Sequence, residues 1–239
     1  MSVHPIPDGV RTETLHPLVV DLFKRKQWTQ RTPPWYEVRR GLITASDAAA
    51  ALGVPPFKSF KGDPRKELLQ KKLDNAPIFG MALVHGVKYE DEASEMAMRV
   101  LGETSFEFGL LVHKELPWLA ASPDGITARG FAVEIKCPTK RKIVPGEIPH
   151  HYYPQVQCQM EVCDLPATYF IQYKPAYLNE NQRPFVDIVV IERDRRWFAD
   201  NVGTLKSFWQ ELMDKRKTHV PREIATESLC SIRDDLYAA

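Results

Sequence analysis

The chain has 239 residues, of which 44% are hydrophobic and 26% charged, and its formal net charge at pH 7 is +1. This composition indicates an ordinary globular protein with a sizeable core, and the small net charge by itself points to no class of partner. No run of about 18 apolar residues occurs and the N-terminus lacks the layout of a secretion signal, so we expect no membrane association.

The first half of the chain is predicted to be mainly helical. Periodic apolar residues indicate four helices, at Leu15–Trp28, Asp47–Leu52, Asp63–Leu73 and Ala82–Leu101. Ser46 is placed to cap the second helix, and Pro64 suits the first position of the third. The inner face of the longest helix is predicted to consist of Leu83, Val87, Ala93, Ala97 and Val100.

The second half of the chain is predicted to supply most of the strands. Strands are expected at Phe106–Phe108, Leu110–Val112, Leu119–Ser122, Phe131–Lys136, Thr168–Tyr173 and Val186–Ile191, with turns at 123–125 and 129–130. Two further helices are expected, at His151–Cys163 and Arg195–Lys217. This order favours an α/β (mixed α+β) fold with a central mixed sheet flanked by helices. The main domain is predicted over residues 31–217, between an N-terminal extension (1–30) and a C-terminal tail (218–239).

The four cysteines do not form any CxxC pair. They are Cys137, Cys158, Cys163 and Cys230. Structural zinc sites and disulfide frameworks need characteristic cysteine spacings, so the sequence predicts neither. A reducing, cytoplasmic location is therefore expected.

The residues with the clearest chemical meaning are Asp124, Glu134 and Lys136. Asp124 lies at a strand end, and Glu134 and Lys136 lie two apart on the next strand, so their side chains share a face. If the two strands pair, two carboxylates and one ammonium converge. Hard oxygen ligands suit Mg²⁺, for which Mn²⁺ can substitute, and the carbonyl of Ile135 is a further candidate ligand.

An alternative interpretation is that Glu134 and Lys136 are solvated residues on an edge strand. Val133 alternates with the charged pair, which instead favours one apolar and one charged strand face. Glu90, in the longest helix, could add a third carboxylate. Its alternative is an ordinary solvated helix position, since glutamate is a good helix former.

Several motifs in this order resemble the lambda exonuclease, or YqaJ-type viral recombinase, family of the PD-(D/E)XK nuclease superfamily. The matching segments are Trp35 with Arg39–Ser46, Gly86 with Glu90 and Ala93, Ser122–Gly125, Glu134–Pro138, Tyr152 with Gln155–Gln157, and Val189–Asp194. The resemblance covers roughly residues 35–200. It implies a restriction-endonuclease-like core and a 5′-to-3′ exonuclease that digests linear double-stranded DNA to mononucleotides and leaves 3′ overhangs.

The resemblance also implies a role for each site residue. Asp124, Glu134 and the Ile135 carbonyl would bind the metal, Glu90 would help to hold it or its waters, and Lys136 would serve the attacking water. The 5′-phosphate would be bound by Arg39, Ser46, Ser122 and Gln155. Arginine offers a planar fork for phosphate oxygens, and Ser46 would gain from a helix N-terminus. Each of these residues also has an ordinary structural interpretation. Arg39 could be a surface cation, Ser46 an N-cap, Ser122 a turn former and Gln155 an exposed glutamine.

The implied partners are double-stranded DNA ends, a single-strand annealing protein and, in a homotrimer, further copies of the chain. Lys140, Arg141 and Lys142 could contact DNA phosphates or form a solvated loop.

Two other functions stay open at this point: a PD-(D/E)XK endonuclease of restriction or repair, and a non-catalytic DNA-binding protein on the same fold. The presence of Asp124, Glu134 and Lys136 argues against the second.

Overall fold

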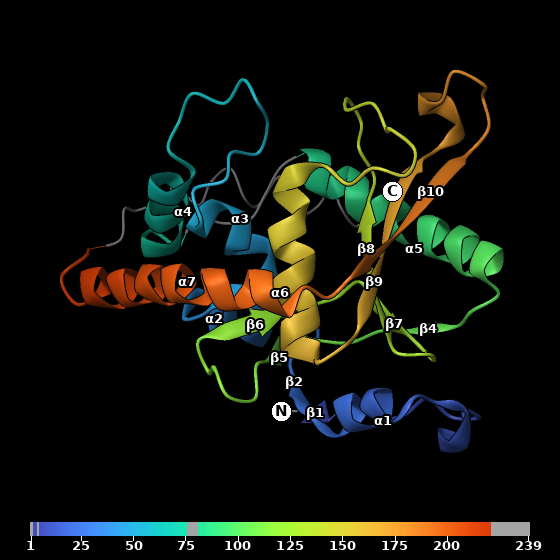
Figure 1. The fold of residues 1–239 in the computed structure, drawn as a ribbon, viewed down its shortest axis with the longest axis horizontal. Helices are drawn as coiled ribbons and strands as arrows, with labels where there is room; N and C mark the ends of the chain where they lie inside the picture. Colours follow the sequence, from blue (N-terminus) through green and yellow to red (C-terminus); the bar gives the residue numbers. More distant parts are fainter. Residues whose placement is uncertain (1, 4, 76–80, 221–239) are drawn as a thin grey trace.

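A five-stranded mixed sheet lies at the centre of the computed structural model, which describes residues 2–3, 5–75 and 81–220 (Figure 1). In spatial order its strands are β10 (Phe185–Glu192), β9 (Ala167–Lys174), β8 (Phe131–Lys136), β7 (Gly125–Thr127) and β4 (Ser105–Phe106). Strands β8 and β9 run parallel, and the other neighbouring pairs are antiparallel. The predicted mixed sheet is confirmed, and β8 is its middle strand rather than an edge.

Two helices cover opposite faces of this sheet (Figure 1). Successive side chains of β8 point to opposite faces, so neighbouring residues of β8 contact different helices. Val133 packs with Ala93 of α5 (Met81–Leu101) on one face. Glu134 faces α6 (Tyr153–Cys163), whose side chains donate hydrogen bonds to its carboxylate. The predicted separation of an apolar from a charged strand face is confirmed.

A smaller sheet and five more helices complete the described fold. The smaller sheet has the order β3 (Ile43–Thr44), β6 (Leu119–Ala121) and β5 (Leu111–Val112), and β1 (Ser2–Val3) pairs with β2 (Lys26–Gln27). The other helices are α1 (Pro17–Lys24), α2 (Pro33–Arg40), α3 (Ala48–Ala51), α4 (Pro64–Leu73) and α7 (Arg195–Arg216). Short 3₁₀ turns lie at Thr12–Thr14, Ala45–Asp47, His150–Tyr152 and Ala176–Leu178. No helix among the described residues has the length and apolarity needed to cross a bilayer.

Helix α1 belongs to the main core, although it lies in the predicted N-terminal extension. Val19, Leu22 and Phe23 are buried in the same apolar cluster as Phe106 and Phe108. The rings of Phe23 and Phe108 are 4.6 Å apart, centroid to centroid. Burial of such a ring contributes about 1.5–3 kcal/mol, so the extension helps to stabilise the domain that follows it.

Helix α5 follows its predicted bounds, but its predicted inner face is partly wrong. Ala93 and Ala97 are fully buried, whereas Val87 is 36% exposed and Val100 is 67% exposed. The buried stripe continues from Ala97 to Leu101, four residues on, and thereby leaves Val100 on the outer side. The side chain of Leu83, the fifth residue of the predicted face, lies outside the described residues.

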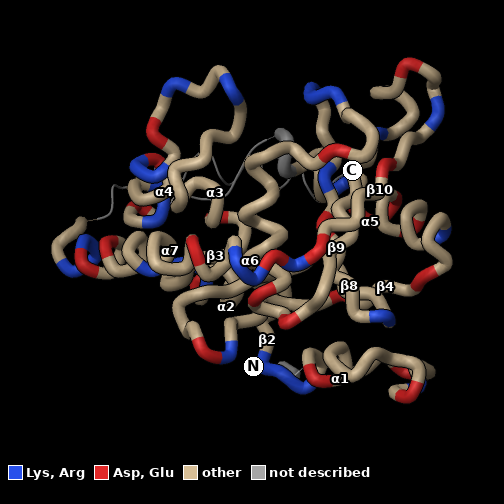
Figure 2. Tube along the Cα trace, viewed as in Figure 1, with Lys and Arg blue, Asp and Glu red and all other residues tan. Residues whose placement is uncertain are grey.

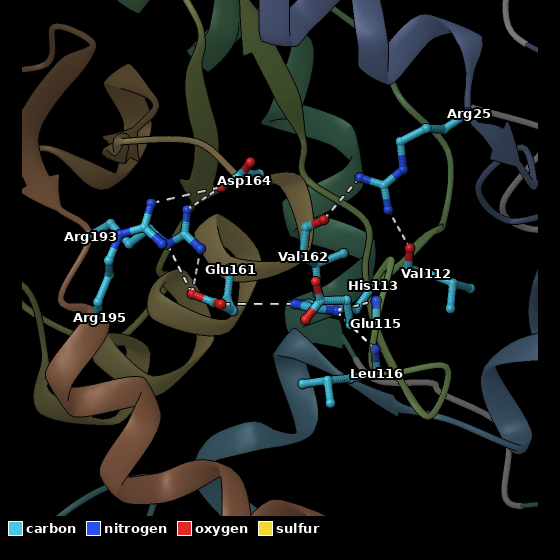
Figure 3. Close-up of polar contacts among 10 residues, drawn as sticks. All are labelled: Arg25, Val112, His113, Glu115, Leu116, Glu161, Val162, Asp164, Arg193 and Arg195. Atoms are coloured by element: carbon cyan, nitrogen blue, oxygen red, sulfur yellow. Dashed lines mark hydrogen bonds and ion pairs between the residues drawn. The ribbon is translucent and has the colours of Figure 1, made fainter.

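The C-terminal end of α6 is fixed by a network of charged groups (Figure 3). Arg193 donates through Nε and Nη2 to Glu161 Oε2, at 2.9 and 2.6 Å, and through Nη1 to Asp164 Oδ1 at 2.6 Å. From the other side, Arg25 Nη1 donates to the carbonyl of Val162 at 3.0 Å. These contacts hold the C-terminal end of α6 against residues from both ends of the chain.

Candidate active site

The carboxylate of Asp124 accepts a hydrogen bond from the N–H of Ile135, to which β7 offers no main-chain acceptor. Strand β7 begins at Gly125, opposite Val133, and the N–H of Asp124 donates to the carbonyl of Val133 at 3.1 Å. Pro123 lacks an N–H and cannot extend the ladder. The carboxylate of Asp124 takes over instead, since its Oδ2 accepts the N–H of Ile135 at 2.7 Å. The hydrogen bond at the start of β7 therefore fixes the orientation of the Asp124 carboxylate.

Glu134 is a buried carboxylate that accepts hydrogen bonds from three side chains. Its side chain is 2% exposed. Lys136 Nζ and Gln155 Nε2 donate to Oε1, the second at 2.6 Å, and Gln159 Nε2 donates to Oε2 at 3.0 Å. A buried charge is tolerated only when it is paired and hydrogen-bonded, so these three donors explain how the carboxylate remains buried.

Lys136 lies between the carboxylates and an aromatic ring. Its ammonium contacts Glu134 and lies 5.1 Å from the ring centroid of Tyr152. Burial lowers the pKa of Lys136, but the charges of Glu134 and Asp124 outweigh burial and raise the pKa above the ordinary lysine value. The side chain therefore carries a positive charge beside the carboxylates, as the predicted role near a phosphodiester requires.

Glu90 reaches the electrostatic neighbourhood of the two strand carboxylates, but its direct partner is a residue that the sequence did not suggest. Its Oε2 is paired with Arg31 Nη2 at 2.5 Å. Burial raises the pKa of Glu90, and the charges of Asp91 and Glu134 raise it further, against the effect of Arg31. The charge of Glu134 thus acts on Glu90, while the direct contact of Glu90 is with Arg31.

The excess of negative charge suits a divalent cation. Burial raises the pKa of Asp124 well above its ordinary value, and Glu134 and Glu90 raise it further. Among the residues described, no three histidine, cysteine or acidic side chains form a ready-made metal cluster. The predicted ligands are two carboxylates and the Ile135 carbonyl, which is an oxygen donor set that a hard cation prefers. The residues therefore fit Mg²⁺, and the cysteines described, Cys137, Cys158 and Cys163, are free thiols.

Beside these carboxylates lies a cavity of about 430 Å³ that contains three of the four predicted phosphate ligands. Arg39, Ser46 and Gln155 line it, together with Lys71 and Tyr152. In the described part of the chain, Arg39 makes no ion pair within 4 Å, and burial lowers its pKa. Asp47 also lines the cavity and its charge raises the pKa of Arg39, but Asp47 is ion-paired with Lys72 at 2.8 Å, so the guanidinium of Arg39 is suited to bind an anion in the cavity.

Aromatic packing and a serine hydroxyl fix the orientation of Arg39. Its guanidinium carbon lies 4.2 Å from the ring centroid of Trp35, and its Nη2 donates to Ser46 Oγ at 3.3 Å. Trp35 is itself held by a hydrogen bond from its indole Nε1 to Ser122 Oγ, at 3.0 Å. Ser122, the fourth predicted phosphate ligand, is not part of the cavity wall and supports Arg39 through Trp35.

The predicted N-cap role of Ser46 is wrong. The residue that precedes α3 is Asp47, which makes no side-chain cap hydrogen bond. Thr44 caps the preceding 3₁₀ turn, and its hydroxyl and N–H donate to Asp47 Oδ2 at 2.7 and 2.9 Å. Ser46 lies within this 3₁₀ turn, and α3 has only four residues. A helix this short has little dipole. Ser46 therefore contributes its exposed hydroxyl to the cavity and not a helix N-terminus.

Gln155 connects the cavity to the carboxylates. It lines the cavity, and its amide also donates to Glu134 Oε1. Sequence reasoning assigned it to the phosphate alone and missed both Gln159 and Arg31. The spacing of Gln155 and Gln159, one helical turn apart, was the available signal for Gln159. For Arg31, which lies 59 positions from its partner Glu90, there was no local signal.

Comparisons with known proteins identify the family of this chain and relatives of its fold. A family model described as the YqaJ-like viral recombinase domain matches residues 34–166. An uncharacterized protein of Acanthamoeba polyphaga mimivirus is 30% identical over an alignment of 174 residues that covers 65% of this chain and 31% of that relative. The chain therefore spans under a third of the length of that relative. An alkaline exonuclease from Laribacter hongkongensis, LHK-Exo, has a TM-score of 0.63 at 23% identity, with 86% of this chain and 100% of that chain covered. A phage related exonuclease from Haemophilus somnus has a TM-score of 0.53 at 15% identity, with 73% and 96% covered. The two structural matches show a shared fold.

Proposed function

Because this chain belongs to the YqaJ-like viral recombinase domain family, we propose that it is a Mg²⁺-dependent 5′-to-3′ exonuclease acting on linear double-stranded DNA. Its products would be mononucleotides and a duplex with a 3′ overhang. One observation carries the proposal: Gln155 lines a cavity suited to a phosphate and bonds to a buried carboxylate of the candidate metal site. Phosphate recognition and hydrolysis would thus take place on adjacent phosphates of one strand.

The metal would be held by residues at the β7–β8 junction. Asp124, Glu134 and the carbonyl of Ile135 are the proposed ligands. When bound, the ion lowers the pKa of a water ligand and offsets charge that develops on the phosphate. The hydrogen bond from Ile135 would hold the Asp124 carboxylate in place for the ion. Mn²⁺ offers similar coordination and would substitute.

Lys136 and Glu90 would act on the reacting groups from two sides. The Lys136 ammonium, next to Glu134, would orient the attacking water and stabilise the extra negative charge of the transition state. Glu90 would accept hydrogen bonds from waters on the far side of the site. Its ion pair with Arg31 sets the position of its carboxylate.

The cavity would bind the terminal 5′-phosphate. Arg39 and Ser46 would contact its oxygens, with Gln155 donating from the catalytic side and Ser122 supporting Arg39 through Trp35. The fold relative LHK-Exo has been solved in complex with dAMP. A nucleotide of that kind is what this chain would release from each 5′ end.

Basic residues on two loops would contact the duplex beyond the cavity. Figure 2 shows Lys and Arg on the loop between α3 and α4 and on the loop between β8 and α6, which project on the same side of the molecule. The residues are Lys58, Lys61, Lys140, Arg141 and Lys142. The first loop also supplies Phe60 to the cavity wall. Contacts to phosphates would weaken with rising salt.

The proposal is tested with three uniformly labelled substrates in parallel: linear duplex with 5′-phosphate, linear duplex with 5′-hydroxyl, and closed circular duplex. With Mg²⁺ we expect rapid release of mononucleotides from the first, slower release from the second and none from the third. EDTA should stop all release. Cleavage of circular DNA would identify an endonuclease instead, and no release from any substrate would contradict catalysis altogether.

Replacing Arg39 with lysine should weaken recognition of the 5′-phosphate. Lysine keeps the charge but loses the planar fork and the stacking on Trp35. A charge-assisted hydrogen bond contributes about 1.5–3 kcal/mol, so KM for phosphorylated ends should rise about 10- to 100-fold, with little change for 5′-hydroxyl ends. The matched control is Arg40→Lys, an exposed neighbour on the same helix. An equal effect on both kinds of end would refute a phosphate-specific role.

A further inference from the structure

Three glutamines lie at alternate positions of α6, and they point in two directions. Gln155 and Gln159, four residues apart, both donate to Glu134. Gln157 lies between them and points elsewhere: it donates to the carbonyl of Glu192 at 2.9 Å and accepts the N–H of Asp194 at 2.7 Å. Residues four apart share a helix face, whereas those two apart do not, so the helix itself separates these contacts.

The two glutamines that face Glu134 contact different oxygens of its carboxylate. Gln155 shares Oε1 with Lys136, whereas Gln159 is the donor recorded on Oε2. Gln155 also lines the cavity next to Arg39. Gln159 is not among the residues that line that cavity, and it is 1% exposed. Among the described residues its amide therefore donates only to Glu134, and it is removed from solvent.

Burial of Gln159 is unfavourable for stability in one respect. Its Oε1 is buried and has no hydrogen-bond partner among the described residues. An unsatisfied buried polar atom costs about 1–3 kcal/mol, and an apolar side chain of the same shape would avoid that cost. The hydrogen bond to Glu134 is the feature of the site that an apolar side chain would lose.

We propose that Gln159 is a positioning residue that fixes the orientation of the Glu134 carboxylate for metal binding. This inference rests on the proposed role of Glu134 as a metal ligand. With Oε2 held by Gln159, the carboxylate keeps one rotamer while Gln155 donates a hydrogen to a phosphate in the cavity. Partners that orient a ligand in this way typically change metal affinity 10- to 100-fold when removed.

The test compares Gln159→Met with Gln157→Met, since both wild-type glutamines are 1% exposed and on the same helix. Mn²⁺ binding to the DNA-free protein is measured by calorimetry, thermal unfolding is followed in EDTA, and kcat and KM are measured on 5′-phosphorylated duplex. We expect Gln159→Met to weaken Mn²⁺ binding by about 10-fold or more and to lower kcat with little change in KM. Gln157→Met should lower the unfolding temperature and leave Mn²⁺ affinity unchanged.

A second variant, Gln159→Asn, keeps the amide but shortens its reach by one methylene, and it should also weaken Mn²⁺ binding. Wild-type Mn²⁺ affinity in a folded Gln159 variant would overturn the inference, as would an equal loss of affinity in Gln157→Met. If the wild-type protein binds Mn²⁺ but degrades no DNA, the proposed function fails while a Gln159-specific loss of affinity still supports the positioning role. If it binds no Mn²⁺, Glu134 is not a ligand and the inference is overturned.

Discussion

Asp124→Asn is expected to reduce nuclease turnover by about 10³-fold or more and, in the absence of metal, to stabilise the folded protein. Turnover falls because an amide oxygen is a weaker ligand than a carboxylate for a hard cation. The backbone contact survives, since the amide oxygen can still accept the N–H of Ile135. Stability rises because the wild-type carboxylate is buried close to Glu134 and Glu90, which disfavours its charged form.

The gain in stability should depend on pH with a definite sign. Burial and the neighbouring carboxylates raise the pKa of Asp124 in the folded state above its unfolded value, which is about 3.9. The wild-type protein therefore keeps its full stability from this group below about pH 4 and loses stability as pH rises through the raised pKa. The asparagine variant does not titrate at this position, so its advantage in EDTA should be small at about pH 4 and large at alkaline pH.

Thermal unfolding in EDTA across this pH range provides the measurement, with turnover measured separately in Mg²⁺. The control is Asp187→Asn, at a half-buried aspartate of β10 that accepts from Gly146 and Gln172. That variant should keep turnover near wild type and should not gain stability. If Asp124→Asn digests DNA at the wild-type rate, Asp124 is not a metal ligand.

Lys136→Ala is expected to lower kcat by about 10²- to 10⁴-fold while DNA binding stays largely intact. The ammonium contacts Glu134, so its removal deletes the positive charge next to the proposed reacting phosphate. Glu134 would keep its two glutamine donors, which limits the loss of folding stability. The 5′-phosphate cavity retains Arg39, so the affinity for DNA ends should change little.

Binding is measured by fluorescence anisotropy with Ca²⁺ in place of Mg²⁺, and turnover is measured under single-turnover conditions. Lys206→Ala, at an exposed position of α7, is the control and should behave as wild type in both assays. Undiminished cleavage by Lys136→Ala would refute the assigned role. A parallel loss of binding and cleavage would instead place Lys136 in substrate recognition.

The strongly patterned elements could be predicted from the sequence, and the short strands only in part, since β5 and β6 lie within predicted strands. Strand β8 follows its predicted bounds because charged and apolar residues alternate along it. Strands β3 and β7 were missed, since two or three residues carry no detectable period. The error at Ser46 has a different origin: Thr44 and Asp47 form a capping box that is better satisfied than a single serine cap.

In the candidate site too, some residues could be predicted from local sequence patterns and others could not. Asp124, Glu134 and Lys136 follow from a strand end and a spacing of two, which are local features of the chain. The pairing of Glu90 with Arg31 and the contact of Gln159 with Glu134 depend on how α5 and α6 pack against the sheet. Such contacts are set by tertiary structure, so no local pattern identified them.

The hydrogen bond between Asp124 and Ile135 ties the length of β7 to the position of a proposed ligand. Adding one residue between Pro123 and Gly125 would let a main-chain group take the N–H of Ile135, and successive side chains of a strand alternate in direction. The carboxylate would then lose its anchor and turn to the opposite side. We therefore expect this corner of the sheet to tolerate no change in length, whereas the loops at 54–63 and 139–149 connect elements whose ends are fixed elsewhere, so the fold should accept changes in their length.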